Sequence, residues 1–297
     1  MGFGRGKVIL FGEHAVVHGY PAIAVGIERG VTARAEPASE DRLSIAPWNL
    51  EIAPDPNGEP LERAFAVALE GYRERPALSI HADVELPAGA GLGCSAAIGV
   101  AVLDAIDEAL GNTRDREALA EAALAWEAVF HGNPSGVDNT MSAVGGVALF
   151  RKGSPLESLH SNKPLYLVIG NSGESPSTKA MVDLVARQFE DDRALVTKSF
   201  EAIEVLVRNA RLALQSGDHV ALGQLLDLNH SILSSLMVCT SKLDKMCQTA
   251  RDAGALGAKM TGGGGGGCMV ALAPKNDEAM RIASVLGDEA FVAEVRA

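Results

Sequence analysis

The feature that most constrains the fold of this chain is a strand that leads through a glycine-rich turn into a helix. Apolar and polar residues alternate from Leu78 to Leu86, which predicts a strand with one buried face. The next segment reads Pro87-Ala88-Gly89-Ala90-Gly91-Leu92-Gly93-Cys94-Ser95. After it, apolar residues recur at helical spacing at Ile98, Val102, Ile106 and Ala109. The three glycines predict a sharp turn whose backbone can approach a ligand closely, with no Cβ in the way.

This turn has the properties of an anion site. The first N–H groups of a helix lack partners within the helix and carry a partial positive charge, which favours a bound phosphate. The hydroxyl of Ser95 is a candidate ligand for a phosphate or for a phosphate-bound Mg²⁺. An N-terminal helix cap is the alternative reading of Ser95. The segment is not a Walker A loop, because no lysine follows its glycines.

A second glycine run, Gly262 to Gly267, precedes the apolar strand predicted from Cys268 to Ala273. A dinucleotide-binding turn follows a strand and opens a helix, so that reading is rejected. Six consecutive glycines are costly to order. The run therefore indicates close approach to a ligand or to another backbone.

Length and charge limit the classes of function. The chain has 297 residues, which suggests two domains or one large one. A formal net charge of -12 without a lysine and arginine run argues against binding to nucleic acid or to a membrane surface. The four cysteines form no C-x-x-C pair, and no segment reads as a signal peptide or a transmembrane helix. We expect a cytoplasmic protein with free thiols.

Three charged residues are candidates for catalysis. Asp138 lies in the turn-rich segment His131 to Asn139, Glu127 lies near the end of a predicted helix, and Lys7 precedes the first predicted strand. A turn residue, a solvated helix face and an ordinary surface lysine are the respective alternatives. The polar stretch from Arg151 to Pro164 predicts a boundary between domains at 1–160 and 161–297.

The secondary structure expected elsewhere is mixed. We expect strands at Val8 to Phe11, Val147 to Phe150, Leu165 to Ile169 and Ala290 to Val295. Ala22 to Ile27 and Val31 to Ala35 are expected to form a strand pair around Glu28-Arg29-Gly30. We expect helices at Leu61 to Tyr72, Arg116 to Val129 and Asn276 to Leu286, and mostly helix from Lys179 to Ala253. The stretch from Ala46 to Pro60 reads as irregular.

Four segments together resemble the mevalonate kinase family of the GHMP kinases. They are Gly6 to Gly19, Pro87 to Ala97, His131 to Asn139 and Lys259 to Cys268, which resemble the family's first motif, its P-x-G-x-G-L-G-S-S-A phosphate loop, its H-G-N-P-S-G-V-D-N segment and its K-x-T-G-x-G-G-G-G-C motif. The resemblance implies two α/β (α+β) domains, the N-terminal one ribosomal-protein-S5-like and the C-terminal one ferredoxin-like. It also implies transfer of a phosphoryl group from ATP to a hydroxyl of mevalonate.

The resemblance also implies roles for residues. The ATP phosphates would be bound by Pro87, Gly89, Ala90, Gly91, Leu92, Gly93, Cys94, Ser95 and Ala96. Ser95 and Glu127 would hold Mg²⁺, Asp138 would accept the proton of the hydroxyl, and Lys7 would stabilise the developing charge. Substrate contacts would come from Glu13, His14, Thr178, Thr261 and Gly262.

Departures from the family pattern keep some alternatives open. Cys94 replaces the first serine of the phosphate loop, Gly263 replaces a common alanine, and Leu236-Met237-Val238-Cys239-Thr240 replaces L-G-V-S near the substrate side. The alternatives are the same chemistry on phosphomevalonate, homoserine or a sugar, and a catalytically silent sensor of this fold. Phosphorylation coupled to decarboxylation is disfavoured by Lys7. Assembly as a homodimer is left open.

Overall fold

The computed structural model describes residues 1–72, 74–131, 134–154, 156–174 and 178–296. The chain packs into two compact units, each assembled from separate stretches of sequence. The first contains Met1–Lys7, Glu28–Ala88 and Gly93–Gly145, and the second contains Val8–Ile27, Gly89–Leu92 and Gly146–Ala297. The boundary predicted between residues 160 and 161 stays a prediction.

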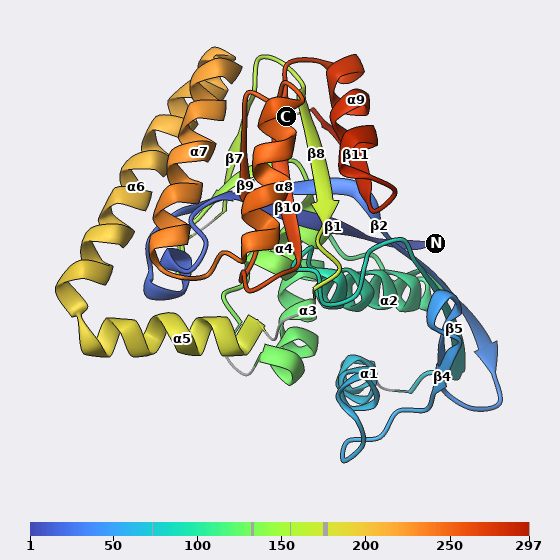
Figure 1. Ribbon diagram of the computed structural model, residues 1–297. Helices are drawn as coiled ribbons and strands as arrows, with labels where there is room; N and C mark the ends of the chain where they lie inside the picture. Colours follow the sequence, from blue (N-terminus) through green and yellow to red (C-terminus); the bar gives the residue numbers. More distant parts are fainter. Residues whose placement is uncertain (73, 132–133, 155, 175–177, 297) are drawn as a thin grey trace. The chain divides into compact units, whose positions relative to one another are not determined.

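Helices and strands are mixed along the described parts of the chain (Figure 1). The helices are α1 (Pro60–Glu70), α2 (Cys94–Leu110), α3 (Arg116–His131), α4 (Val137–Val144), α5 (Thr178–Asp191), α6 (Arg193–Ser216), α7 (His219–Ser235), α8 (Ser241–Asp252) and α9 (Asn276–Leu286), with 3₁₀ turns η1 (Ala15–His18) and η2 (Ala46–Trp48). The strands are β1 (Gly2–Phe11), β2 (Ala22–Ala38), β3 (Arg42–Ile45), β4 (Leu50–Ile52), β5 (Ala77–Val84), β6 (Val147–Phe150), β7 (Glu157–Leu159), β8 (Leu165–Asn171), β9 (Gly257–Met260), β10 (Cys268–Ala273) and β11 (Ala290–Val295).

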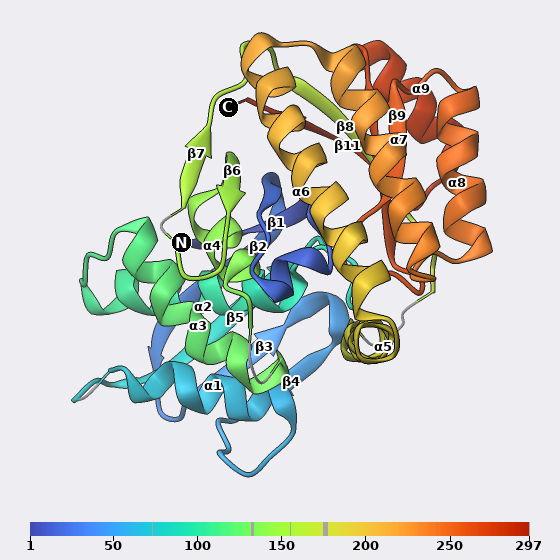
Figure 2. The same cartoon turned by 90° about the vertical axis from the view of Figure 1, so that its left-hand side faces the viewer.

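The first unit is built around β5. This strand pairs antiparallel with the second half of β2, from Val31 opposite Val84 to Ala38 opposite Ala77, and parallel with β3. The predicted alternation is confirmed, because Leu78 and Ile80 are buried while His81 and Asp83 are exposed. Helix α2 packs on β5, α3 and α4, and α1 packs on α3 (Figure 2). This packing fixes the start of α2, which follows the glycine turn.

The second unit contains a four-stranded antiparallel sheet in the order β11-β8-β10-β9. Every residue of β9 and β10 is buried, which explains why β10 reads as a continuous apolar run. Helices α7, α8 and α9 lie against this sheet (Figure 1). The first half of β2 pairs with β6, which pairs with β7. Helix α5 packs on α6 and is seen end-on in Figure 2.

Two local predictions are wrong. Residues 22–38 form one continuous strand rather than a strand pair. Gly30 stays extended there, and the missing side chain leaves room for the Gly4 carbonyl of the first unit. The segment around Asp138 is not only turn, because α4 begins at Val137 and places Asp138 in its first turn. In the irregular stretch, Leu50–Ile52 forms the short strand β4.

None of the helices in the described part of the chain has the length and apolar content that a bilayer-spanning helix needs.

Candidate active site

Lys7 and Asp138 form an ion pair in the first unit. Lys7 lies in β1 and Asp138 in the first turn of α4, and the Lys7 Nζ is 3.1 Å from Asp138 Oδ1. Lys7 is almost fully buried, whereas about a third of the Asp138 side chain (32%) is exposed. The lysine stem lies against Gly93, where a Cβ would come within 2.9 Å of Lys7 Cγ. A residue without a side chain at position 93 therefore leaves the space that the lysine occupies.

Ser95 and Glu127 form a second polar pair in the same unit. The Ser95 hydroxyl donates a hydrogen bond of 2.6 Å to Glu127 Oε1. The indole N–H of Trp126 donates to the Ser95 carbonyl at 3.0 Å, and its ring packs over Gly99, which joins α3 to the start of α2. The other oxygen of Glu127 lies 3.5 Å from Nε2 of His131. The two side chains thus present hard oxygen atoms, which Mg²⁺ prefers.

The electrostatics of Glu127 distinguish it from a solvated helix residue. Burial, the largest cause, and the negative charge of Asp138 together raise its pKa to about 7, against the opposing effects of the Ser95 hydrogen bond and Lys7. Glu127 is 1% exposed. A buried carboxyl with a raised pKa beside a second carboxyl is a site that a divalent cation would neutralise.

The glycine turn before α2 adopts the left-handed conformations that only glycine takes easily. The φ angles are 67° at Gly89, 81° at Gly91 and 72° at Gly93, and α2 begins at Cys94. The Cys94 side chain is buried, and burial raises the pKa of its thiol to about 12. The thiol therefore stays protonated near pH 7, and the group that Cys94 offers to an anion is its backbone N–H at the start of α2.

The two glycine-rich segments lie backbone to backbone in the second unit. A Cβ on Gly262 would come within 3.2 Å of the Gly91 Cα, and a Cβ on Gly267 within 2.9 Å of the Ala90 carbonyl oxygen. Gly264 similarly faces the Val238 carbonyl. The expected close approach to another backbone is confirmed at Gly262, Gly264 and Gly267.

Glu13 and His14 lie in the second unit between β1 and η1. The Glu13 carboxylate is buried and forms an ion pair with Lys259. His14 has a φ of 62°, and its Nε2 lies 2.9 Å from the Gly263 carbonyl. A carbonyl only accepts, so Nε2 carries the hydrogen and Nδ1 keeps a lone pair. Burial lowers the pKa of His14 to about 4, which keeps the ring neutral near pH 7.

Of the other predicted substrate residues, Thr261 forms hydrogen bonds within the protein, whereas the Thr178 side chain is not described. The Thr261 hydroxyl donates to the Ile9 carbonyl and accepts from the Ile9 N–H, both at 3.0 Å. Thr178 opens α5, but its side chain lies outside the described part of the structure. Gly132 and Asn133 of the His131 to Asn139 segment also lie outside the described residues.

Sequence reasoning did not assign a role to Lys259, to Asn229 or to His230, all of which are buried. The available signal was a lysine inside a strand whose other residues are apolar or glycine. Charged residues are almost never fully buried unless paired, so such a position implies a partner. The partner itself is distant in sequence.

Comparisons with known proteins identify the family of the chain. The GHMP kinases N terminal domain matches residues 61–146, and the GHMP kinases C terminal domain matches residues 210–293. A curated mevalonate kinase of Pyrococcus horikoshii is 36% identical, over 90% of this chain and 87% of the relative. The mevalonate kinase of Pyrococcus furiosus is 34% identical, over 97% and 94%.

A solved structure extends the agreement to the whole fold. The L. major mevalonate kinase in complex with R-mevalonate matches with a TM-score of 0.88 and 30% identity, over 99% of this chain and 95% of that chain. The predicted two-domain GHMP kinase fold is therefore confirmed. By its motifs, its fold and its similarity to relatives over nearly their full length, the chain belongs to the mevalonate kinase family of the GHMP kinases.

Proposed function

We propose that this protein transfers the γ-phosphoryl group of ATP to a hydroxyl of mevalonate, giving phosphomevalonate and ADP. The observation that carries the proposal is the pair formed by Lys7 and Asp138, with 3.1 Å between Nζ and Oδ1. A carboxylate beside a buried ammonium is suited to take a proton from an alcohol while the cation stabilises the oxygen that loses it. The mevalonate kinases to which the chain is similar support the choice of acceptor.

In this mechanism Asp138 accepts the proton of the attacking hydroxyl. The oxygen forms a bond to the γ-phosphorus, and the bond between that phosphorus and the bridging oxygen of ADP breaks. Phosphoryl transfer needs mainly positioning and neutralisation of charge. The left-handed glycines and the start of α2 offer backbone N–H groups to the phosphates.

Ser95 and Glu127 are the residues that would hold Mg²⁺. The donor set fits, because both residues offer oxygen and Glu127 is a buried carboxyl whose pKa is raised by burial and by the negative charge of Asp138. When bound, Mg²⁺ would neutralise charge on the phosphate oxygens. Glu127 must be ionised to serve as a ligand, which couples metal binding to pH.

On the acceptor side we propose His14 as a substrate contact. Its Nε2–H is committed to the Gly263 carbonyl, so its neutral ring presents Nδ1 as a hydrogen-bond acceptor for a hydroxyl. Thr261, Gly262 and Thr178 remain proposed substrate residues on the strength of the family resemblance. The Glu13 side chain is engaged inward, so we propose that it acts indirectly.

The test is ADP release by the purified protein with Mg-ATP and a panel of mevalonate, phosphomevalonate, homoserine and galactose. We expect turnover with mevalonate at about 1–100 s⁻¹, which is typical of kinases. Turnover with another acceptor would keep the mechanism and refute the substrate. No turnover with any acceptor would favour the silent sensor.

A further inference from the structure

Lys259 is a fully buried cation with a saturated set of partners. Its Nζ forms an ion pair with Glu13 Oε1 and lies 2.5 Å from the Met260 carbonyl and 3.5 Å from the Ile9 carbonyl. An ammonium group has three N–H donors, so these three oxygens can use all of them. Both Lys259 and Glu13 have no exposed side-chain surface. Neither charge can turn toward solvent without unpacking the protein around it.

Glu13 is held on its other side as well. Asn229 of α7 donates from Nδ2 to Glu13 Oε2 at 3.3 Å. The carboxylate is therefore fixed between β9 and α7, and it cannot at the same time face a substrate. The sequence predicted that Glu13 contacts the substrate directly. This geometry instead favours a role in which Glu13 holds neighbouring residues in position.

His14, the next residue, depends on that support. Its φ of 62° places it in a backbone conformation that side-chain-bearing residues rarely adopt and that costs free energy. Such a conformation persists only where the surroundings impose it. The Glu13 anchor fixes the backbone on one side of His14, and the bond to Gly263 fixes the ring on the other.

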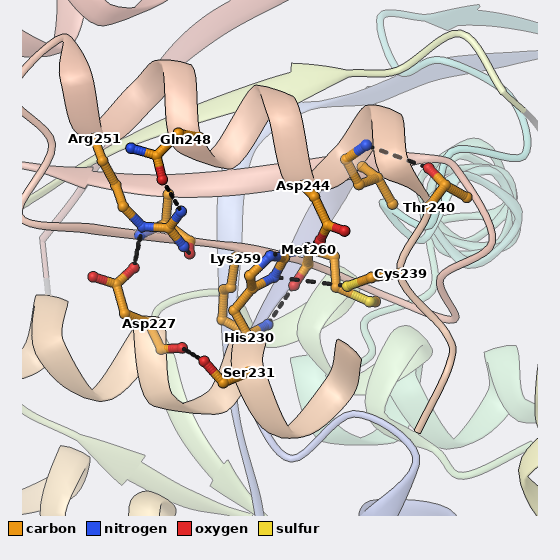
Figure 3. Close-up of polar contacts among 12 residues, drawn as sticks. Asp227, His230, Ser231, Cys239, Thr240, Asp244, Gln248, Arg251, Lys259 and Met260 are labelled. Atoms are coloured by element: carbon orange, nitrogen blue, oxygen red, sulfur yellow. Dashed lines mark hydrogen bonds and ion pairs between the residues drawn. The ribbon is translucent and has the colours of Figure 1, made fainter. Parts of the chain in front are cut away.

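The strand that carries Lys259 is itself fixed from two directions (Figure 3). The Met260 carbonyl accepts from Lys259, and the Met260 N–H donates to Nδ1 of His230 at 3.3 Å. Nε2 of His230 then carries the hydrogen and lies 3.1 Å from Asp244 Oδ1. The Cys239 thiol lies 3.7 Å from the same Nδ1. Both ring nitrogens are used within the protein, so the His230, Cys239 and Asp244 cluster reads as a hydrogen-bonded support rather than a set of metal ligands.

We propose that Lys259 is a positioning residue that sets the affinity for the acceptor substrate by fixing Glu13 and, through it, His14. This inference rests on the proposed function, in which His14 contacts the acceptor. Lys259 touches neither the phosphates nor the reacting hydroxyl in this scheme. Its loss should therefore appear in the KM for the acceptor rather than in the chemical step.

The first experiment compares Lys259→Met with the wild-type enzyme. We expect the KM for mevalonate to rise at least about ten-fold, with kcat and the KM for ATP changing less than about three-fold. Lys275→Met is the matched control, because the Lys275 side chain is exposed and, among the described residues, forms an ion pair only with the partly buried Glu278. It should leave every constant unchanged. An unchanged KM for mevalonate in Lys259→Met overturns the proposal.

The double variant Lys259→Met/Glu13→Gln separates positioning from charge balance. Removing one partner of a buried pair leaves an uncompensated charge, whereas removing both charges does not. We expect the double variant to regain much of the unfolding temperature that Lys259→Met loses, while its KM for mevalonate stays raised. If the KM returns to the wild-type value together with the unfolding temperature, Lys259 acts only by balancing charge, and the proposal fails.

Two further variants keep the test decisive if Lys259→Met does not fold. Lys259→Gln keeps an N–H donor for the Met260 carbonyl, and Glu13→Gln keeps Lys259 with its two carbonyl contacts. Either should show the same rise in KM with little change in kcat. A wild-type enzyme that does not phosphorylate mevalonate refutes the proposed function. A wild-type enzyme that does, with an unchanged KM in these variants, refutes only the role of Lys259.

Discussion

The Lys7 ammonium lies 3.1 Å from the Asp138 carboxylate, and the lysine stem is held against Gly93 at the end of the phosphate turn. The same lysine therefore connects the residue that would accept a proton with the turn that would bind the phosphates. Its burial limits the directions in which the ammonium can point. In the proposed mechanism, this pair would stabilise charge at the hydroxyl oxygen that loses its proton.

Replacing Asp138 tests this arrangement directly. Asp138→Asn keeps the size of the side chain and should fold normally, because the carboxylate is partly exposed at the start of α4. We expect kcat to fall by about 10²–10⁴-fold, the usual contribution of a general base. Steady-state kinetics with a circular dichroism spectrum would measure both. Retention of more than about a tenth of kcat would exclude Asp138 as the base.

The raised pKa of Glu127 predicts a pH-dependent affinity for Mg²⁺. With a pKa of about 7, the carboxyl is mostly protonated at pH 6 and mostly ionised at pH 8, and only the ionised form binds metal. We expect the Mg²⁺ concentration for half-maximal turnover to be about ten-fold higher at pH 6 than at pH 8. Glu127→Gln should abolish this difference. A wild-type midpoint that does not move with pH contradicts the assignment.

The Ser95 hydroxyl should matter for metal use and not for folding. Ser95→Ala removes one oxygen and the hydrogen bond to Glu127. We expect the Mg²⁺ midpoint to rise about ten-fold or more, while the unfolding temperature changes little. Ser199→Ala is a suitable control, since Ser199 is half-buried on α6 and bonds only to the Leu195 carbonyl in the described structure. Equal midpoints in the two variants would refute the role of Ser95.

The lowered pKa of His14 predicts that the free energy of unfolding depends on pH. Its pKa is about 4 in the folded protein and about 6.5 when unfolded, so the unfolded chain binds the proton more tightly. The stabilisation is present above pH 6.5 and is lost as the pH falls toward 4, with a total on the order of 3 kcal/mol. Urea titrations across this range should show a shallower pH dependence for His14→Gln. Parallel curves for the two proteins would show that His14 does not contribute.

The backbone conformation of Met237 predicts that a glycine at this position would stabilise the protein. It has a φ of 58° and is 74% exposed, so its side chain contributes little packing while its backbone is strained. We expect Met237→Gly to raise the free energy of unfolding by about 0.5–1 kcal/mol, the relief of strain less the entropy that glycine adds to the unfolded chain. Met280 offers a control of opposite sign. It is exposed inside α9, where glycine should cost about 1 kcal/mol.

The spacing of apolar residues along the chain correctly predicted several helices and strands. The helix Asn276–Leu286 and the strand Ala290–Val295 were predicted with the bounds that the structure has, and the alternation along β5 led correctly into α2. The continuity of β2 was missed because Glu28-Arg29-Gly30 reads as a turn. Whether that segment turns or stays extended is decided by the close approach of Gly4, which is a tertiary contact.

The site was predictable where a motif places residues near one another along the chain, and less so where folding joins distant ones. The glycine turn and Ser95 follow from sequence spacing. The partner of Glu13 does not, because Lys259 comes from a strand at the other end of the chain. The sequence contains both charges but no signal that pairs them. A resemblance to a family suggests that Glu13 matters, and only the fold shows that its carboxylate faces inward.

The contact between Gly91 and Gly262 couples the effects of substitutions in two stretches that are distant in the sequence. A Cβ on Gly262 would come within 3.2 Å of the Gly91 backbone, which would have to move by a few tenths of an ångström, whereas a Cβ on Gly91 would be in ordinary contact with Gly262 at 3.5 Å. Each glycine has a positive φ, which disfavours replacement by another residue. Substitutions at the two positions should therefore be non-additive, because each alters the space available to the other. In a library of variants, the residues accepted at position 262 would therefore depend on the residue at position 91.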